Sequence, residues 1–274
     1  MVIHGRDIAD EIKTRLIEEV RALPRAPRLA LIVTTRDFAT ERFLAVKRRW
    51  AGELGVVLEE IDLGMDATVE TICVAIEELS EKHDGIIVQL PLPPGVSVEQ
   101  VIEVIPRTHD VDVLSQKATH AFVQKQTAVL PPVVGAFAAI LQKQEVSCRD
   151  ARVVVVGNGR LVGRPAALWF AREGAQVTVV EEDEDLPEHT KTADIVVLGA
   201  GVPGLLKPEM VKKEVVILDA GTSESAGKLS GDADPACAEK AALFTPVPGG
   251  VGPITIAMLF QNLLVLMRER GING

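Results

Sequence analysis

The chain has 274 residues, of which 47% are apolar. Its 29 lysine and arginine residues and 39 aspartate and glutamate residues give a net charge of −10. This composition predicts a soluble globular chain, and its length suffices for two domains of about 100 to 200 residues each. The acidic excess argues against duplex nucleic acid or an anionic membrane surface as a partner, because neutralising phosphates requires clustered lysine and arginine. No uninterrupted apolar run approaches the roughly 18 residues of a membrane span, and the first residues carry charge where a signal peptide needs an apolar segment, so we expect a cytoplasmic protein.

Short apolar runs alternate with helical patterns along the first half of the chain. This alternation is typical of strand, helix, strand units, so the predicted fold class is α/β with parallel-type sheets. Continuous apolar runs such as IIVQL predict strands that are covered on both faces. We expect helices at 7–23, 39–54 and 69–82, and strands at 29–35, 56–63 and 85–90.

A second series of elements follows a weaker stretch after Asp112. A helix is predicted at 132–144, followed by short valine-rich strands at 151–156, 176–180, 195–198 and 215–218. The last segment, 253–270, has apolar residues at helical spacing and needs a core to cover, so we expect it to return to the first domain. The predicted domains are therefore 1–118 with 253–274, and 119–252.

The spacing of cysteine and histidine indicates no metal site. The three cysteines, Cys73, Cys148 and Cys237, lie far apart without a C-x-x-C pair, and the five histidines form no H-x-x-x-H or H-E-x-x-H pair. We therefore predict neither a metal ion nor a disulfide framework.

A glycine-rich turn follows the first strand of the second domain. Gly157, Gly159 and Gly163 form G-x-G-x-x-x-G, one residue longer than the usual dinucleotide fingerprint, at the opening of a helix. Glycine suits such a turn because a pyrophosphate must approach the backbone, and the helix N-terminus supplies N–H groups and a positive dipole. The alternative is a glycine-rich turn with a structural role only.

Glu181 bears on which dinucleotide this turn binds. It ends the next predicted strand, 24 residues after Gly157, where a Rossmann-type unit places the acid that accepts hydrogen bonds from the adenosine ribose. A carboxylate there repels a 2′-phosphate, so NAD is favoured over NADP. Alternatively, 181–184 is a solvated acidic loop, and Arg160 and Arg164 are also able to serve a phosphate.

A proline- and glycine-rich loop precedes the last helix. The segment TPVPGGVGPIT, at 245–255, combines prolines, which fix the backbone, with glycines, which leave it free to adopt unusual conformations. Such a composition is typical of an ordered loop that a ligand can approach closely. The alternative is a domain linker in which proline starts the helix.

Several separated motifs, in order along the chain, now point to one family. The chain resembles the bifunctional methylenetetrahydrofolate dehydrogenase/cyclohydrolase family over nearly its whole length. The most specific motif is PVPGGVGP. The motifs are the helix with Lys47, VQLPLP at 88–93, DVD at 110–112, GNGRLVGRP at 157–165, LDAG at 218–221, GD at 231–232 and PVPGGVGP at 246–253.

The resemblance implies a reaction and a site. The family oxidises 5,10-methylenetetrahydrofolate to the methenyl form by hydride transfer to a nicotinamide cofactor, then hydrolyses the methenyl bridge to 10-formyltetrahydrofolate. The folate lies in a cleft between the two domains, the second of which is a Rossmann-like dinucleotide-binding domain, and the family is usually homodimeric. Lys47 matches the catalytic lysine, Gln89 the glutamine that tunes it, and Asp112 the carboxylate that holds the pterin ring.

The remaining matches line the two ligand sites. Phe43, Val88 and Leu90 match the folate pocket. The matching folate loop comprises Pro248, Gly249, Gly250, Val251 and Gly252, and Gly157, Asn158, Gly159 and Thr222 stand at the positions of dinucleotide contacts. Gly163 and Glu181 are predicted as cofactor-binding residues from the glycine turn and from the end of the next strand.

The residue types also suit this chemistry without the resemblance. Attack of water on a methenyl carbon needs a base near neutrality, and a lysine serves if burial and a neutral hydrogen-bond partner such as Gln89 lower its pKa. Asp112 can accept paired N–H donors from a pterin amide edge. Taken alone, Lys47 is an ordinary surface lysine, Asp112 a turn or cap residue, and Gln89 a polar group at the end of a strand.

The chain departs from the family at several positions. The family tyrosine one helical turn before the lysine is Phe43, so a hydroxyl is lost and we expect hydrolysis to suffer more than hydride transfer. Asn158 and Glu181 replace groups suited to a 2′-phosphate, and Val113 replaces a glycine. The alternative function is therefore a catalytically impaired relative that binds folate or a dinucleotide.

Overall fold

The computed structural model describes residues 1–181, 185–225 and 228–272. It divides into two compact units, and the predicted α/β class with parallel sheets is confirmed. We call Glu11–Pro132 with Ile256–Gly274 the lysine unit, and Met1–Asp10 with Val133–Thr255 the glycine-loop unit. This division differs from the predicted domains in that residues 1–10 and 253–255 belong to the glycine-loop unit and residues 119–132 to the lysine unit.

The lysine unit is built on a parallel three-stranded sheet. Its strands are β1 (Arg28–Val33), β2 (Val57–Asp62) and β3 (Gly85–Val88), in the order β2-β1-β3. In this sheet Ile32 lies opposite both Ile61 and Val88. Its helices are α1 (Gly5–Ala22) and α9 (Val251–Glu269), which each begin in the glycine-loop unit, and α2 (Phe38–Leu54), α3 (Val69–Ser80), α4 (Val98–Ile102) and α5 (Gln116–Val123).

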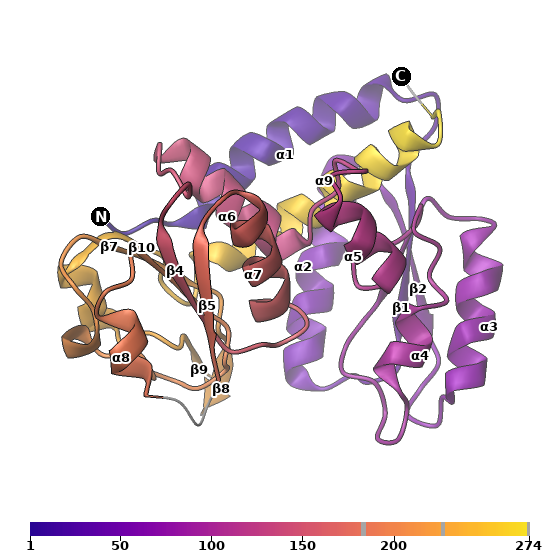
Figure 1. Cartoon of the computed structure of the whole chain (residues 1–274). Coiled ribbons are helices and arrows are strands. Elements are labelled where there is room, and N and C mark those ends of the chain that lie inside the picture. The colour runs from indigo at the N-terminus through magenta and orange to yellow at the C-terminus, as the bar shows by residue number, and fades with distance from the viewer. Residues whose placement is uncertain (182–184, 226–227, 273–274) are drawn as a thin grey trace. The chain divides into compact units, whose positions relative to one another are not determined.

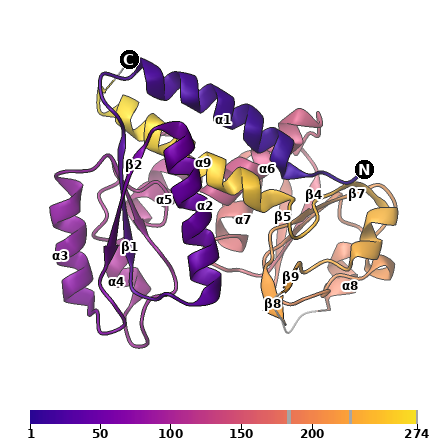
Figure 2. The same cartoon turned by 180° about the vertical axis from the view of Figure 1, so that it is seen from behind.

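Helices cover both faces of this sheet, which is why β1 and β3 are nearly continuous apolar runs, whereas the edge strand β2 has no buried residue. Figures 1 and 2 show α2 and α3 on opposite sides of β1 and β2. On the α3 side, Ile32 and Val88 belong to a core cluster with residues of α3 and α4. On the other side, a side chain at Gly85 would overlap Leu263 of α9, so this helix packs directly on β3.

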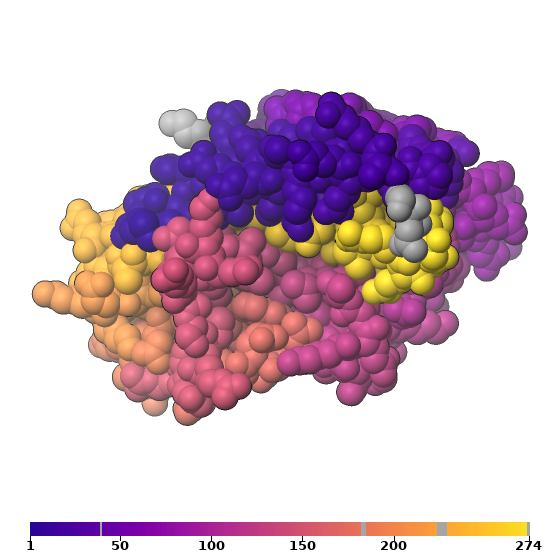
Figure 3. All heavy atoms as spheres, turned by 90° about the horizontal axis from the view of Figure 1, so that it is seen from above, coloured from indigo at the N-terminus to yellow at the C-terminus, as the bar shows by residue number. Residues whose placement is uncertain are grey.

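Helix α9 is the main core helix of the lysine unit. Its length and composition would suit a membrane span, but 67% of it is buried inside the protein, as expected for a core helix. Phe260 stacks on Trp50 of α2 with ring centroids 6.2 Å apart, and Gln261 accepts a hydrogen bond of 2.5 Å from Arg15 of α1. Figure 3 shows α1, in indigo, lying along the yellow α9.

The glycine-loop unit is built on a parallel five-stranded sheet in the order β10-β7-β6-β4-β5. The chain passes from β4 through α7 to β5 on one side, then through α8 to β6 on the other side of β4. Ligands of open α/β sheets bind at such a switch point, beyond the carboxyl ends of the strands. The elements are α6 (Pro132–Lys143), β4 (Arg152–Val156), α7 (Gly163–Arg172), β5 (Gln176–Val180), α8 (Leu186–Thr190), β6 (Ile195–Leu198), the 3-10 helix η1 (Pro208–Met210), β7 (Val215–Asp219), the hairpin of β8 (Ser223–Ser225) and β9 (Lys228–Ser230), η2 (Pro235–Glu239) and β10 (Ala241–Phe244).

Candidate active site and dinucleotide site

Helix α2, which carries Lys47, has well-defined ends. Asp37 caps its N-terminus, where the side chain accepts a hydrogen bond of 2.7 Å from the Thr40 backbone N–H. Gly55 ends it in the left-handed conformation at φ 75°, which glycine adopts without strain. These two caps fix the residues between them as one rigid element.

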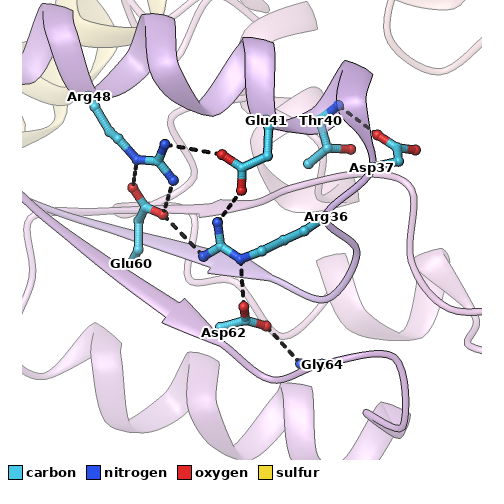
Figure 4. A network of polar contacts seen from close by, with 8 residues as sticks. All are labelled: Arg36, Asp37, Thr40, Glu41, Arg48, Glu60, Asp62 and Gly64. Carbon is cyan, nitrogen blue, oxygen red and sulfur yellow. Dashed lines mark hydrogen bonds and ion pairs between the residues drawn. The ribbon is translucent and has the colours of Figure 1, made fainter.

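A network of five charged side chains ties the outer side of α2 to the sheet (Figure 4). Arg48 on α2 donates to Glu60 of β2 at 2.7 Å, and Arg36, just after β1, donates to Asp62 at 2.5 Å. Glu41 on α2 accepts from both arginines. Each exposed pair contributes little by itself, but together the pairs hold α2 against β2. The charges of β2 also protect this edge strand from pairing with other chains.

Lys47 lies on the inner side of α2 and is only 8% exposed. Its Nζ donates a hydrogen bond of 2.7 Å to Oε1 of Gln89, the residue that follows β3. The Gln89 amide donates in turn to the carbonyl of Leu90 at 2.7 Å, which fixes its orientation. The buried Lys47 amine therefore has an uncharged hydrogen-bond partner. Gln89 orients the amine but adds no negative charge that would neutralise its protonated form.

Asp112 completes this group, and the three predicted catalytic residues influence one another. Burial lowers the pKa of Lys47, and the charge of Asp112 opposes this effect. Burial also raises the pKa of Asp112 to about 6, while Lys47 pulls it down and Asp110 pushes it up. Lys47 is thus suited to accept a proton, and Asp112 is ionised at neutral pH.

The two carboxylates of the DVD motif have different roles. Asp110 is buried and pairs with Ile86 of β3, and its oxygens accept backbone hydrogen bonds from Leu114 at 3.1 Å and Ser115 at 2.8 Å. It therefore holds the loop, whereas Asp112 is only partly buried. Val113 has φ 57°, in the left-handed region, which is strained for a β-branched residue. Glycine would adopt this conformation without strain, so it would suit this position better.

Asn262 on α9 also supports this loop, although no sequence motif predicted this role. Its buried side-chain amide donates to the carbonyls of Val111 at 2.8 Å and Leu130 at 2.7 Å. The available signal was a polar residue among the apolar positions of the last helix. Asn262 thus anchors the backbone next to Asp112.

The three other predicted folate residues of the lysine unit differ in how they are placed. Phe43 lies one turn before Lys47 on α2 and is 46% exposed. Leu90 is half-buried directly after Gln89. The Val88 side chain belongs to the core, so only its backbone is left to contact a ligand.

The glycine turn after β4 contains two glycines that the fold requires and one that it does not. Gly157 has φ 89°, and a Cβ there would lie 2.8 Å from the Gly199 carbonyl. A Cβ on Gly163 would lie 1.8 Å from the Gly157 carbonyl, so α7 packs directly on the turn. At Gly159 a Cβ would meet only Gly199 O at 3.8 Å, which is ordinary contact. Gly159 leaves room for a ligand beside α7, whose N-terminus has no side-chain cap, so these residues fit a pyrophosphate.

Asn158 and Glu181 meet at the carboxyl ends of the neighbouring strands β4 and β5. The Asn158 side-chain amide donates a hydrogen bond of 3.0 Å to Oε1 of the exposed Glu181. Residues 182–184 of the acidic run lie outside the described residues. Thr222 is exposed and follows β7, which lies two strands from β4 in the sheet.

The proline- and glycine-rich loop is shaped by its own backbone. The Gly250 N–H donates to the Pro246 carbonyl at 2.7 Å, and Gly249 accepts from the Gly5 N–H at 2.8 Å. Val251 is buried and already begins α9, two residues before the predicted start of this helix. Gly250 is buried too, so exposed Pro248 and Gly252, with half-buried Gly249, are the predicted loop residues that remain accessible to a ligand.

One unit has a parallel sheet with a glycine turn at its switch point, and the other α/β unit holds a buried lysine. These two features define the class of a two-domain dinucleotide-binding α/β enzyme. Family models identify residues 3–112 as a tetrahydrofolate dehydrogenase/cyclohydrolase catalytic domain and residues 131–271 as the NAD(P)-binding domain of the same enzymes. The chain therefore belongs to the tetrahydrofolate dehydrogenase/cyclohydrolase family, as the sequence motifs predicted.

Individual relatives agree over the full length. The bifunctional protein FolD of Thermus thermophilus is 35% identical over 100% of this chain and 99% of its own. The FolD crystal structure from Campylobacter jejuni has a TM-score of 0.94 and 29% identity, covering 98% of this chain and 99% of that one. The Trypanosoma brucei enzyme, complexed with NADP and an inhibitor, has a TM-score of 0.93 and 32% identity, covering 99% and 98%. These matches do not support the alternative of a catalytically impaired relative.

Proposed function

We propose that this chain oxidises 5,10-methylenetetrahydrofolate to the methenyl form with NAD, and hydrolyses the methenyl form to 10-formyltetrahydrofolate. The single observation that carries the proposal is the 2.7 Å contact between the buried Lys47 amine and the neutral Gln89 side chain. Family membership supports both activities.

Hydrolysis uses the three residues of the lysine unit. Water adds to the methenyl carbon while the neutral Lys47 amine takes up one of its protons, which leaves a hydroxyl group on that carbon. The bond from this carbon to N5 then breaks as the hydroxyl loses its proton and N5 gains one, and the carbon stays on N10 as a formyl group. Gln89 keeps the amine oriented through its hydrogen bond. Asp112, ionised above its pKa of about 6, accepts N–H donors from the pterin. Phe43 supplies ring contact but no proton, so Lys47 acts without a neighbouring hydroxyl on that turn.

Dehydrogenation uses the glycine-loop unit to hold the cofactor. The chemistry that a bound nicotinamide dinucleotide supplies is acceptance of a hydride from the methylene carbon. Gly157 and Gly159 let the pyrophosphate approach the backbone, and the N-terminus of α7 offers N–H groups to it. Glu181, held by Asn158, accepts hydrogen bonds from the adenosine ribose and repels a 2′-phosphate, which favours NAD.

The proposal is tested by assaying purified protein with methylenetetrahydrofolate and either NAD or NADP. We expect the absorbance of reduced nicotinamide to grow faster with NAD, and added methenyltetrahydrofolate to disappear faster than it does spontaneously. Absence of reduced nicotinamide with both cofactors would contradict the proposed dehydrogenase.

The glycine turn gives a prediction that separates folding from binding. Gly159→Ala is expected to leave the free energy of unfolding within about 0.5 kcal/mol of wild type, because its Cβ meets only ordinary contact. It should raise the KM for the dinucleotide about tenfold or more, because the methyl group occupies the approach of the pyrophosphate. Gly163→Ala, whose Cβ would overlap the Gly157 carbonyl, should instead lower the melting temperature strongly. An unchanged dinucleotide KM in Gly159→Ala would place the cofactor elsewhere.

The raised pKa of Asp112 predicts how folate binding depends on pH. Because this carboxyl becomes protonated below about pH 6, the Kd of a non-reacting folate should rise as the pH falls from 7 to 5, by up to about tenfold per pH unit below the pKa. Isothermal titration calorimetry with 5-formyltetrahydrofolate measures this. Asp112→Asn should bind more weakly and lose this dependence. A wild-type Kd that stays constant over this range would contradict the role of Asp112.

A further inference from the structure

Two buried carboxylates, Asp219 and Asp232, hydrogen-bond to the loops that follow the carboxyl ends of the central strands in the glycine-loop unit. Asp219 is the last residue of β7, and Asp232 lies between β9 and η2. They are 1% and 0% exposed, and neither has a role in the proposed mechanism. Carboxylates so deeply buried are costly unless they are fully hydrogen-bonded, so their contacts indicate what they are for.

Asp219 holds the backbone that carries Asp232. One of its oxygens accepts hydrogen bonds from the backbone N–H groups of Gly221 at 3.0 Å and Asp232 at 3.3 Å. The other accepts from the Ala233 N–H at 2.8 Å. All the partners are backbone groups close to the end of β7, so Asp219 fixes the position of the GD motif.

Asp232 reaches across to the loop that follows β6. Its Oδ2 accepts two hydrogen bonds, from the backbone N–H groups of Ala200 at 2.7 Å and Gly201 at 2.9 Å. Its Oδ1 is buried and has no hydrogen-bond partner among the residues that the structure describes. Burial raises the pKa of Asp232. Oδ2 therefore makes both of these hydrogen bonds with the loop, and the backbone N–H groups of Gly201, Ala200 and Val202 oppose the rise in the pKa of Asp232.

The loop that Asp232 holds, at Ala200 and Gly201, packs against the glycine turn. A Cβ on Gly157 would lie 3.0 Å from both the N and the Cα of Ala200, so this backbone touches the turn directly. Strand β6 is the neighbour of β4 on the side where the chain order switches, and ligands of such sheets contact the loops on both sides of the switch point. Moving Ala200 and Gly201 would therefore change the shape of the dinucleotide site.

We propose that Asp232 is a positioning residue for the nicotinamide dinucleotide, acting through one carboxyl oxygen that holds the Ala200 and Gly201 backbone against the glycine turn. This inference rests on the proposed binding of the dinucleotide at Gly157 to Gly163. A carboxyl group with an unpartnered buried oxygen is a poor choice for stability alone, and such exceptions to the satisfaction of buried polar groups concentrate at functional sites.

The test compares Asp232→Asn and Asp232→Ala, with Asp234→Asn as a matched control. Asp234 is part-exposed, pairs with Lys207 at 3.2 Å and lies two residues away. For each protein we would measure the KM for NAD in the dehydrogenase reaction and the rate of methenyl hydrolysis. Hydrolysis uses the lysine unit and no dinucleotide, so it reports whether that unit is folded, and the melting temperature of each variant reports whether the glycine-loop unit is folded as well.

Asparagine keeps an oxygen in the place of Oδ2, so Asp232→Asn should leave the KM for NAD within about threefold of wild type. Alanine leaves both N–H groups without their partner, so Asp232→Ala should raise this KM about tenfold or more while hydrolysis stays unchanged. The control should match wild type. An unchanged KM in Asp232→Ala, a parallel loss of hydrolysis and dehydrogenation, or equal effects of asparagine and alanine would each overturn the proposal.

A measurement on the wild-type protein keeps the test independent of any variant that does not fold. The amides of Ala200 and Gly201 should be protected from hydrogen exchange without any dinucleotide, because Asp232 already binds them. Rapid exchange at both would overturn the inference. If Gly159→Ala raises the KM for NAD and Asp232→Ala does not, only this inference fails. If neither does, the proposed dinucleotide site fails as well.

Discussion

Replacing Lys47 with methionine is expected to abolish methenyl hydrolysis while leaving folate binding largely intact. Methionine fills a similar buried volume but has no group that accepts a proton, and loss of a general base costs about 10²- to 10⁴-fold in rate. The free energy of unfolding of Lys47→Met should not be lower than that of wild type. Burial places the pKa of Lys47 below its ordinary value, so the folded state disfavours the charged amine at neutral pH, and a neutral side chain removes that cost.

The measurement is the loss of methenyl absorbance, corrected for spontaneous hydrolysis, together with the Kd of 5-formyltetrahydrofolate. Lys117→Met is the matched control, because Lys117 is an exposed lysine on α5 of the same unit. Its hydrolysis rate should equal that of wild type. Normal hydrolysis by Lys47→Met would refute Lys47 as the base, and lost hydrolysis with lost folate binding would leave it only a binding role.

Exchanging the groups at the ends of β4 and β5 should convert the cofactor preference. In the double variant Asn158→Arg with Glu181→Ser, an arginine replaces the amide that now holds Glu181, and the carboxylate that repels a 2′-phosphate is gone. Removing a repulsion and adding an attraction over a few ångströms should shift the ratio of kcat/KM values toward NADP by about a hundredfold.

Steady-state kinetics with both cofactors measures this shift. Glu188→Ser is the control, because Glu188 is an exposed acid on α8 in the same acidic run and should leave the ratio unchanged. Methenyl hydrolysis should be the same in all these proteins. If the ratio does not move in the double variant, Glu181 does not lie at the adenosine ribose.

The inner strands were predictable because they are buried on both faces and therefore form unbroken apolar runs, whereas the edge strand β2 has the sequence VLEEID and no buried residue. The strand over Val153 to Val156 is one example, with every residue buried. Some of the short elements escaped prediction. Helix α4 has five residues, which is too few for a helical periodic pattern, and β10 was not predicted although β6, with the same four residues in length, was. Helix α9 begins at Val251 because proline is tolerated in a first turn, where its missing N–H has no partner to lose.

The candidate site was predictable only in part, for a physical reason. Lys47, Gln89 and Asp112 belong to motifs, and the contact between Lys47 and Gln89 follows from the way α2 packs on the sheet. Asp232 acts through Ala200, and Asn262 through Val111, in both cases across distant parts of the chain. A single sequence carries no pattern that links such partners, because the pairing depends on the packed fold.

The most direct test of the account is a crystal structure of the protein with a bound folate and oxidised dinucleotide. We predict that the bridging carbon of the folate lies in contact with Nζ of Lys47, with the pterin amide edge on Asp112. A folate bound away from Lys47, or a Lys47 amine turned away from both Gln89 and the folate, would contradict it.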